Sequence, residues 1–215
     1  MPTKPKSNEQ SDPIKDQCQT PDYGTAPILP YLNPDWVIWE PCCGEGQMVD
    51  TLKAAGFKNI IATDILTGHD IFTWRPEQHI DIVVTNPPFS KKYKIIKRLY
   101  SLGIRWAMVM PGDTLMARSA QRLFEQYGME LILLDKRIDY KMPIGGYKGT
   151  AQFSSAWFTH GLNIGKQITY AKLDKPKKSK ITLVDAIRSV ETVAAECDKP
   201  KFIQTSFLME DSRES

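Results

Sequence analysis

The sequence has little cysteine and no long apolar run. Cys42 and Cys43 are adjacent, the other two of its four cysteines lie near the ends, and no Cys-x-x-Cys pair occurs. The histidines, His69, His79 and His160, add no metal-ligand spacing, so we expect neither a metal site nor a disulfide framework. No apolar stretch is long enough to cross a bilayer, and the N-terminus has no apolar signal region. We therefore expect an intracellular, cytoplasmic protein without membrane contact.

An excess of one charge is also absent. The 28 Lys and Arg residues oppose 25 Asp and Glu residues, and the net charge of +3 is too small to indicate nucleic-acid binding by itself. A length of 215 residues with 41% hydrophobic residues predicts one globular domain. We place this domain at residues 20–171, after a polar, disordered segment at 1–19. Residues 172–215 are expected to form a basic linker, a short helix over Leu183–Cys197 and a flexible tail.

Short apolar runs alternate with amphipathic segments along the domain. Strands are predicted at residues 36–40, 59–64, 79–86, 104–110 and 130–134, with a last one at 153–159. Helices are predicted at residues 47–55, 91–102 and 114–127. Apolar strands separated by helices are typical of a mostly parallel sheet with both faces covered. The expected fold class is therefore α/β and Rossmann-like.

Acidic residues follow the carboxyl ends of the first two strands, where open α/β sheets bind ligands. Glu40 ends the first strand, and Gly44 and Gly46 open the turn into the first helix. Asp64 ends the second strand, where its carboxylate can accept both hydroxyls of a ribose or, alternatively, cap a turn. A dinucleotide fingerprint would need a third glycine at Val49, which disfavours a nicotinamide cofactor.

Two of the acids suit a sulfonium nucleoside cofactor. Asp70 can accept from an adenine amine while Phe72 packs nearby, and Glu40 can hold a methionyl ammonium group directly or through water. For each acid the alternative is a residue that only caps the following turn.

The tetrapeptide Asn86-Pro87-Pro88-Phe89 follows the third strand. An adenine amine is a weak nucleophile, and the Asn86 oxygen and the Pro87 carbonyl can both accept its protons. The two prolines fix the backbone and offer no competing N–H group. Phe89 offers a stacking face for an extruded base. The alternative is a rigid turn between a strand and a helix.

These motifs resemble the amino-methyltransferase family of DNA adenine methyltransferases. Residues 40–46 resemble its first motif, Asp64 its second, Asp70–Phe72 its third and Asn86–Phe89 its catalytic motif. Thr20 and Pro21, with Ile28 and Leu29, resemble the N-terminal segment that closes over the methionine moiety, and residues 151–158 resemble the late strand before the final hairpin.

The resemblance covers residues 20–165. It implies the seven-stranded class I methyltransferase fold, S-adenosylmethionine as cofactor and the N6 amine of adenine in DNA as target. The implied cofactor-binding residues are Thr20, Pro21, Glu40, Pro41, Gly44, Gly46, Asp64, Ile65, Asp70 and Ile71. The sequence departs from the family in having Phe89 where Tyr is commoner, and in leaving no room for a large target-recognition domain. A compact, phage-type enzyme fits best.

Basic residues cluster in two places. The first cluster follows the catalytic motif and contains Lys91, Lys92, Lys94, Lys97 and Arg98. The second contains Lys136, Arg137, Lys141 and Lys148, with aromatic residues that include Tyr147. Both are expected to contact nucleic acid, and the alternative for each is a solvated helix face or hairpin tip.

Other substrates share the chemistry of the tetrapeptide. Adenine in RNA and a protein glutamine also present an sp² nitrogen, so the alternatives are an RNA adenine methyltransferase and a protein glutamine methyltransferase. An inactive methyltransferase-like binding subunit is a third alternative, although Asn86–Phe89 is intact.

Overall fold

The computed structural model describes residues 15–141 and 153–176. The chain divides after Lys175 into two units, and the fold described here is that of the first. Several predictions, namely those for residues 1–14, Tyr147, Lys148 and the helix at 183–197, lie outside the described residues.

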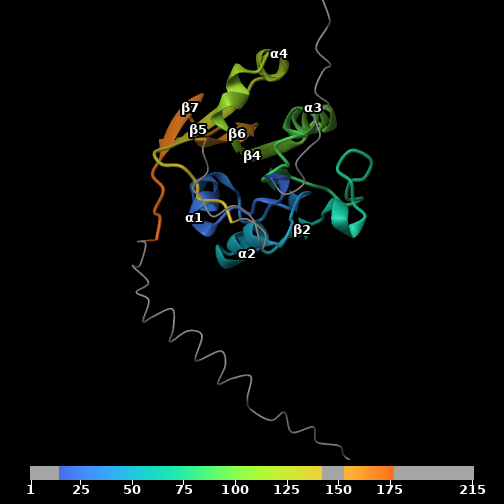
Figure 1. The fold of residues 1–215 in the computed structure, drawn as a ribbon. Helices are drawn as coiled ribbons and strands as arrows, with labels where there is room; N and C mark the ends of the chain where they lie inside the picture. Colours follow the sequence, from blue (N-terminus) through green and yellow to red (C-terminus); the bar gives the residue numbers. More distant parts are fainter. Residues whose placement is uncertain (1–14, 142–152, 177–215) are drawn as a thin grey trace, which may run out of the picture. The chain divides into compact units, whose positions relative to one another are not determined.

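Within the described residues, seven strands form one sheet in the order β2-β1-β3-β4-β6-β5-β7 (Figure 1). They are β1 (Ile38–Glu40), β2 (Ile60–Ala62), β3 (Ile82–Thr85), β4 (Arg105–Pro111), β5 (Glu130–Leu134), β6 (Ser155–His160) and β7 (Ile168–Ala171). β6 runs antiparallel to both of its neighbours, and the other pairings are parallel. This arrangement confirms the predicted Rossmann-like α/β fold with a mostly parallel sheet.

Helices cover both faces of the sheet (Figure 1). The α-helices are α1 (Asp22–Thr25), α2 (Gln47–Ala54), α3 (Lys92–Leu102) and α4 (Arg118–Tyr127). Short 3-10 helices occur at η1 (Lys15–Gln17), η2 (Ala26–Tyr31), η3 (Ile65–Thr67) and η4 (Gly112–Met116). None of the helices in the described part of the chain has both the length and the apolar character that a membrane span needs.

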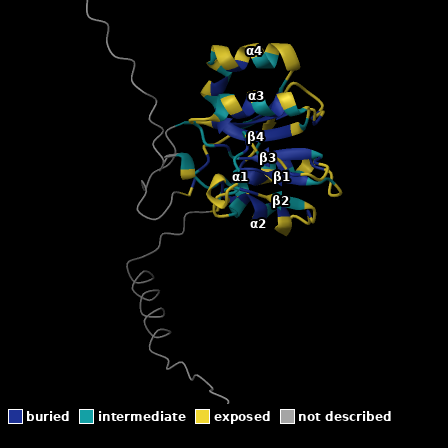
Figure 2. Ribbon diagram, turned by 90° about the vertical axis from the view of Figure 1, so that its right-hand side faces the viewer, coloured by how far each residue is buried: buried dark blue, intermediate teal, exposed yellow. Residues whose placement is uncertain are grey.

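Alternate residues of each central strand enter two separate cores. Ile82 and Val84 of β3 pack with Leu52 of α2, whereas Val83 packs with Ile95 of α3 on the opposite face. This alternation follows from the two-residue repeat of a strand, and it requires the near-continuous apolar runs seen in the sequence. Figure 2 accordingly shows the central strands buried and the helices exposed on their outer sides.

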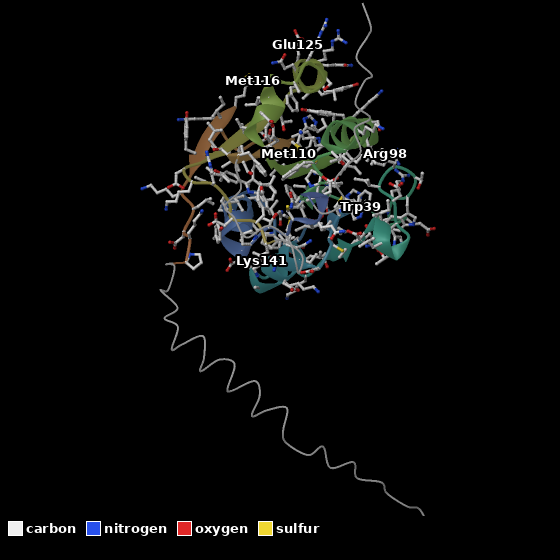
Figure 3. The ribbon with its side chains drawn as sticks, viewed as in Figure 1. Trp39, Arg98, Met110, Met116, Glu125 and Lys141 are labelled. Carbon is white, nitrogen blue, oxygen red and sulfur yellow. The ribbon has the colours of Figure 1, made fainter. Side chains whose placement is uncertain are left out.

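Helix α4 and the strand beneath it show the same division between buried and exposed residues. Met110 of β4 is buried in the core beneath α4, and Glu125 lies on the outer side of the helix (Figure 3). The helix predicted at 114–127 is interrupted at Ala117, whose extended backbone (φ −80°, ψ 121°) separates η4 from α4.

The strand order reverses beside β1. From β1 the chain passes to β2 on one side and then returns to β3 on the other. The loops that leave β1 and β3 therefore diverge and leave a crevice, which is where open α/β sheets bind ligands.

Residues on either side of the predicted domain limits make contacts within the first unit. Gln19, which lies before the predicted start, pairs with Lys141 in an isolated antiparallel bridge. Leu173, which lies after the predicted end, is buried in the core. The strand predicted as the last one, β6, is followed by β7, a mostly exposed edge strand whose sequence lacks a continuous apolar run.

Candidate active site

A cavity of about 690 Å³ lies at the crevice beside β1. Its walls come from the loop after β1, the segment after β2, the turn after β3, the first turn of α3 and the N-terminal residues Asp16–Gln19. Asn86 and Pro88 line it together with Pro41 and Gly44. The turn after β3 and the loop after β1 thus share one cavity.

The predicted cofactor residues divide into two groups. Six of them line the cavity, namely Pro41, Gly44, Asp64, Ile65, Asp70 and Ile71. Thr20, Pro21, Glu40 and Gly46 are not among its lining residues.

Glu40 lies behind the cavity wall. Its side chain is 1% exposed, and Oε1 accepts hydrogen bonds from the Cys42 N–H at 3.0 Å and the Thr85 hydroxyl at 2.5 Å. Oε2 is buried without a partner. Burial raises the pKa of Glu40 to about 8, against the lowering effect of these two hydrogen bonds. A buried carboxyl with one vacant acceptor is a site for a cation or a proton donor.

Asp64 joins two turns of the cavity wall. Its carboxylate accepts from the Gly44 N–H at 3.0 Å and from the Leu66 N–H at 2.9 Å. It forms a capping box with Thr67, which is the local role that the sequence left open as an alternative. Each carboxylate oxygen can accept more than one hydrogen bond, so both functions are compatible.

The adjoining wall combines one acid with apolar side chains. Asp70 Oδ1 accepts from the Phe72 N–H at 2.9 Å, and both residues line the cavity. Ile65 and Leu66, which are 66% and 82% exposed, lie at the same wall. Exposed aliphatic side chains beside an acceptor suit a planar, amine-bearing ring.

Asn86 is held by one end of its carboxamide. Nδ2 donates to the carbonyl of Cys18 at 2.7 Å, whereas Oδ1 is buried and has no partner. An unpartnered buried acceptor is costly unless a ligand satisfies it. The vacant acceptor is the atom that the sequence analysis assigned to an amine proton.

Phe89 has a different environment from the rest of its tetrapeptide. It is not a lining residue of the cavity, and its ring makes edge contacts with Tyr140 and Phe153 at centroid distances of 6.0 and 5.5 Å. Tyr140 is itself fixed by a buried hydrogen bond to Ser155 at 2.8 Å. The three rings form one cluster that ties the turn after β3 to β6.

The predicted basic residues differ in their contacts. Lys91 lies at the cavity, and the Lys92 ammonium stacks over Tyr93 at 4.7 Å. The Lys136 ammonium donates to the Leu173 carbonyl at 3.0 Å. Arg137 and Lys141 are exposed.

Sequence reasoning did not assign several of the lining residues to the cavity. Residues Asp16–Gln19 line it although they were assigned to a disordered segment, and so do Cys42, Glu45, Leu66 and His69. Residues 16–19 have no apolar periodicity, so only their position just before Thr20-Pro21 could have indicated a role. Among the described residues, no group of three or more His, Cys, Asp or Glu side chains is placed to hold a metal ion.

The hydrogen-bond acceptors at the cavity fit a sulfonium nucleoside. Asp64 and Asp70 would supply acceptors for a ribose and an exocyclic amine. Glu40, buried behind the wall, has one carboxyl oxygen without a partner. Gly44 approaches Gln19 so closely that a Cβ there would lie 2.2 Å from the side-chain amide nitrogen Nε2. A larger residue would therefore displace the Gln19 side chain, which lines the cavity.

No family model matches the sequence, and no curated protein matches it. A modification subunit of a putative type I restriction enzyme from Vibrio vulnificus is 12% identical, with a TM-score of 0.44 over 83% of this chain and 53% of that one. A type I restriction-modification methyltransferase subunit from Streptococcus thermophilus is 12% identical, with a TM-score of 0.47 over 90% and 53%. A putative class I S-adenosylmethionine-dependent methyltransferase from Listeria monocytogenes is 13% identical, with a TM-score of 0.47 over 80% and 70%.

The chain spans about half the length of the two restriction-enzyme subunits.

Proposed function

We propose that this chain is an S-adenosylmethionine-dependent methyltransferase that methylates the N6 amine of adenine in DNA. One observation carries the proposal: the vacant Asn86 Oδ1 belongs to a residue of the same cavity that Asp64 and Asp70 line. A nucleoside site and an amine-accepting turn in one cavity are what this transfer needs, because it depends on proximity and alignment.

The cofactor would be held from three sides. Asp64 would accept the ribose hydroxyls with the lone pairs that Gly44 and Leu66 leave free, and Asp70 would accept the adenine amine. Glu40, which holds a proton below its raised pKa, would release that proton and pair with the ammonium group through Oε2. When bound, the cofactor supplies an electrophilic methyl group.

The chain itself prepares the nucleophile. Asn86 Oδ1 and the Pro87 carbonyl accept hydrogen bonds from the two N–H groups of the target amine, which favours a pyramidal nitrogen with an available lone pair. The nitrogen loses one proton to solvent as it gains the methyl group. The two prolines restrict the turn, so its acceptors need little reorganisation when the base arrives. The half-buried ring of Phe89 would offer a stacking surface for the extruded base.

Basic residues beside the cavity support a nucleic-acid substrate. Lys91 and Lys94 are exposed at the cavity, and Arg137 and Lys141 are exposed beyond the Phe89 cluster. Lysine and arginine at such positions neutralise backbone phosphates.

Labelled cofactor and four substrates test the proposal. The protein is incubated with duplex DNA, single-stranded DNA, RNA or protein, and the methylated atom is mapped. We expect label on adenine N6 in DNA and none with the Asn86→Ala variant, which should still bind cofactor. Label on RNA or on glutamine would redirect the substrate assignment, and full turnover by Asn86→Ala would remove the catalytic role of that residue.

A further inference from the structure

The residues Asp16–Gln19, here called the N-terminal arm, contact three separate parts of the site. The Asp16 carboxylate accepts from the Ser90 N–H at 3.2 Å and from the Ser90 hydroxyl at 2.5 Å. The Cys18 carbonyl accepts from Asn86 Nδ2 at 2.7 Å. Gln19 and Lys141 exchange two backbone hydrogen bonds at 2.8 and 3.0 Å. The arm is thus fixed to chain segments that lie far away in the sequence.

The middle contact determines how the Asn86 carboxamide is oriented. A backbone carbonyl can only accept, so it selects the NH₂ end of the carboxamide. A half-turn of the carboxamide would place two oxygens against each other at the same distance. The Cys18 carbonyl therefore leaves Oδ1, the buried and unpartnered atom, as the end that is available to a substrate.

The two outer contacts determine where that carbonyl lies. A hydrogen bond from a loosely held chain end gains little, because ordering the end costs conformational entropy. Cys18 instead lies between two anchored positions, Asp16 on one side and Gln19 on the other. Each of these holds the backbone within two residues of the carbonyl.

We propose that the N-terminal arm is a positioning element of the active site. The Cys18 carbonyl sets the Asn86 carboxamide with its oxygen toward the target amine, and Asp16, through Ser90, holds that carbonyl in place. This inference rests on the proposed function and extends it to two further residues. Asp16 and Ser90 act through Cys18 and Asn86, so they are positioning residues.

Kinetics test the arm with side-chain deletions. We expect Asp16→Ala to lower kcat about tenfold with little change in KM for DNA, the size expected for lost hydrogen bonds to a charged group. Ser90→Ala keeps the backbone N–H, so its kcat should fall by roughly threefold. The kcat of the double variant should be no lower than that of Asp16→Ala alone, because both changes remove the same contact. The exposed Asp22, whose carboxylate accepts from the N–H of its neighbour Tyr23, provides the matched control as Asp22→Ala.

A second measurement needs no activity. The Asn86 side-chain amide signals are recorded by NMR in the protein without ligands, and are assigned by their loss in Asn86→Ala. We expect their protons to exchange with water about tenfold faster in Asp16→Ala, as lost hydrogen bonding implies, and at the wild-type rate in Asp22→Ala. Thermal melting of each variant verifies that it is folded.

The outcomes separate the two proposals. Unchanged amide exchange and unchanged kcat in Asp16→Ala would overturn the positioning role. Equal losses in Asp16→Ala and Asp22→Ala would overturn it too, because the effect would then not depend on the Ser90 contact. If the wild type transfers no methyl group, the proposed function fails, and the amide exchange alone decides whether the arm orients Asn86.

Discussion

The backbone N–H of Gly44 donates to the carboxylate of Asp64 at 3.0 Å, and this bond joins the loop after β1 to the turn after β2. The same carboxylate accepts from Leu66. Asp64 therefore shapes the cavity wall as well as lining it. A change at this residue should affect both the site and its scaffold.

The first prediction concerns Asp64→Asn. The amide keeps only one acceptor oxygen, so the variant cannot satisfy Gly44, Leu66 and a ribose together. We expect cofactor affinity to fall about tenfold, the loss expected for hydrogen bonds to a charged group. Isothermal titration calorimetry measures it. Asp50→Asn, at an exposed position of α2, serves as the control and should bind as the wild type does.

The second prediction tests the close approach of Gly44 and Gln19. A Cβ at residue 44 would lie 2.2 Å from the side-chain amide nitrogen Nε2 of Gln19. The backbone φ of Gly44 is +50°. We expect Gly44→Ala to destabilise the protein by about 1–2 kcal/mol, the combined effect of crowding and a left-handed backbone. Adding Gln19→Ala should restore part of this loss in urea unfolding.

A matched pair of variants distinguishes steric collision with Gln19 from backbone strain at the glycine. Gly56 also has positive φ (+97°), but a Cβ there would meet nothing within 4 Å. Gly56→Ala and Gln19→Ala should therefore be additive in unfolding free energy. If Gln19→Ala had the same coupling energy with Gly56→Ala as with Gly44→Ala, the Gln19 contact would not be the cause of the destabilisation.

The third prediction concerns the buried Glu40, whose pKa is raised by burial to about 8. Between the unfolded pKa, about 4.3, and this value, the folded state binds a proton that the unfolded state has released. The Glu40 contribution to stability therefore falls as pH rises through that window. As pH rises from 5 to 8, the unfolding free energy of Glu40→Gln should increase by a few kcal/mol relative to that of the wild type. Denaturant unfolding across this range measures the difference, and a difference independent of pH would contradict the raised pKa.

The fourth prediction concerns salt dependence. Neutralising the exposed Arg137 and Lys141 should weaken DNA binding and reduce the slope of log K against log salt by about 0.9 for each lost phosphate contact. Lys136→Ala should change the slope less, because its ammonium already donates to the Leu173 carbonyl. An unchanged slope in the Arg137/Lys141 double variant would remove this surface from the DNA interface.

The fifth prediction concerns Trp157 of β6. The side chain is fully buried, and its indole N–H donates to the Gly24 carbonyl at 2.9 Å. Trp157→Phe leaves that carbonyl without its partner, and we expect a loss of about 1–3 kcal/mol in unfolding free energy. Trp36→Phe, at a half-buried position for which no side-chain hydrogen bond is seen, should cost clearly less.

The strands β1, β3 and β4 and their terminal residues were predictable because these strands are buried on both faces. Such burial demands an uninterrupted apolar run, and the residue that ends the run, as Glu40 does, falls at the ligand-binding edge. The grouping of Asn86 with Asp64 follows from the same rule, since parallel strands bring their carboxyl ends to one edge of the sheet.

The arm and the aromatic cluster could not be predicted in this way. Asp16 and Cys18 lie in a polar stretch, and their partners Ser90 and Asn86 are more than 60 residues away. No local pattern encodes such contacts, because tertiary packing alone creates them. The same holds for Phe89, whose ring packs against Tyr140 and Phe153 rather than lining the cavity.

The bond between Trp157 and Gly24 also constrains the order of assembly during synthesis. β6 inserts between β4 and β5, although it follows both in the chain. Gly24 leaves the ribosome early, yet it can acquire its indole partner only after residue 157 has emerged. The hydrogen bond that ties α1 to β6 therefore forms only after most of the sheet has been synthesised.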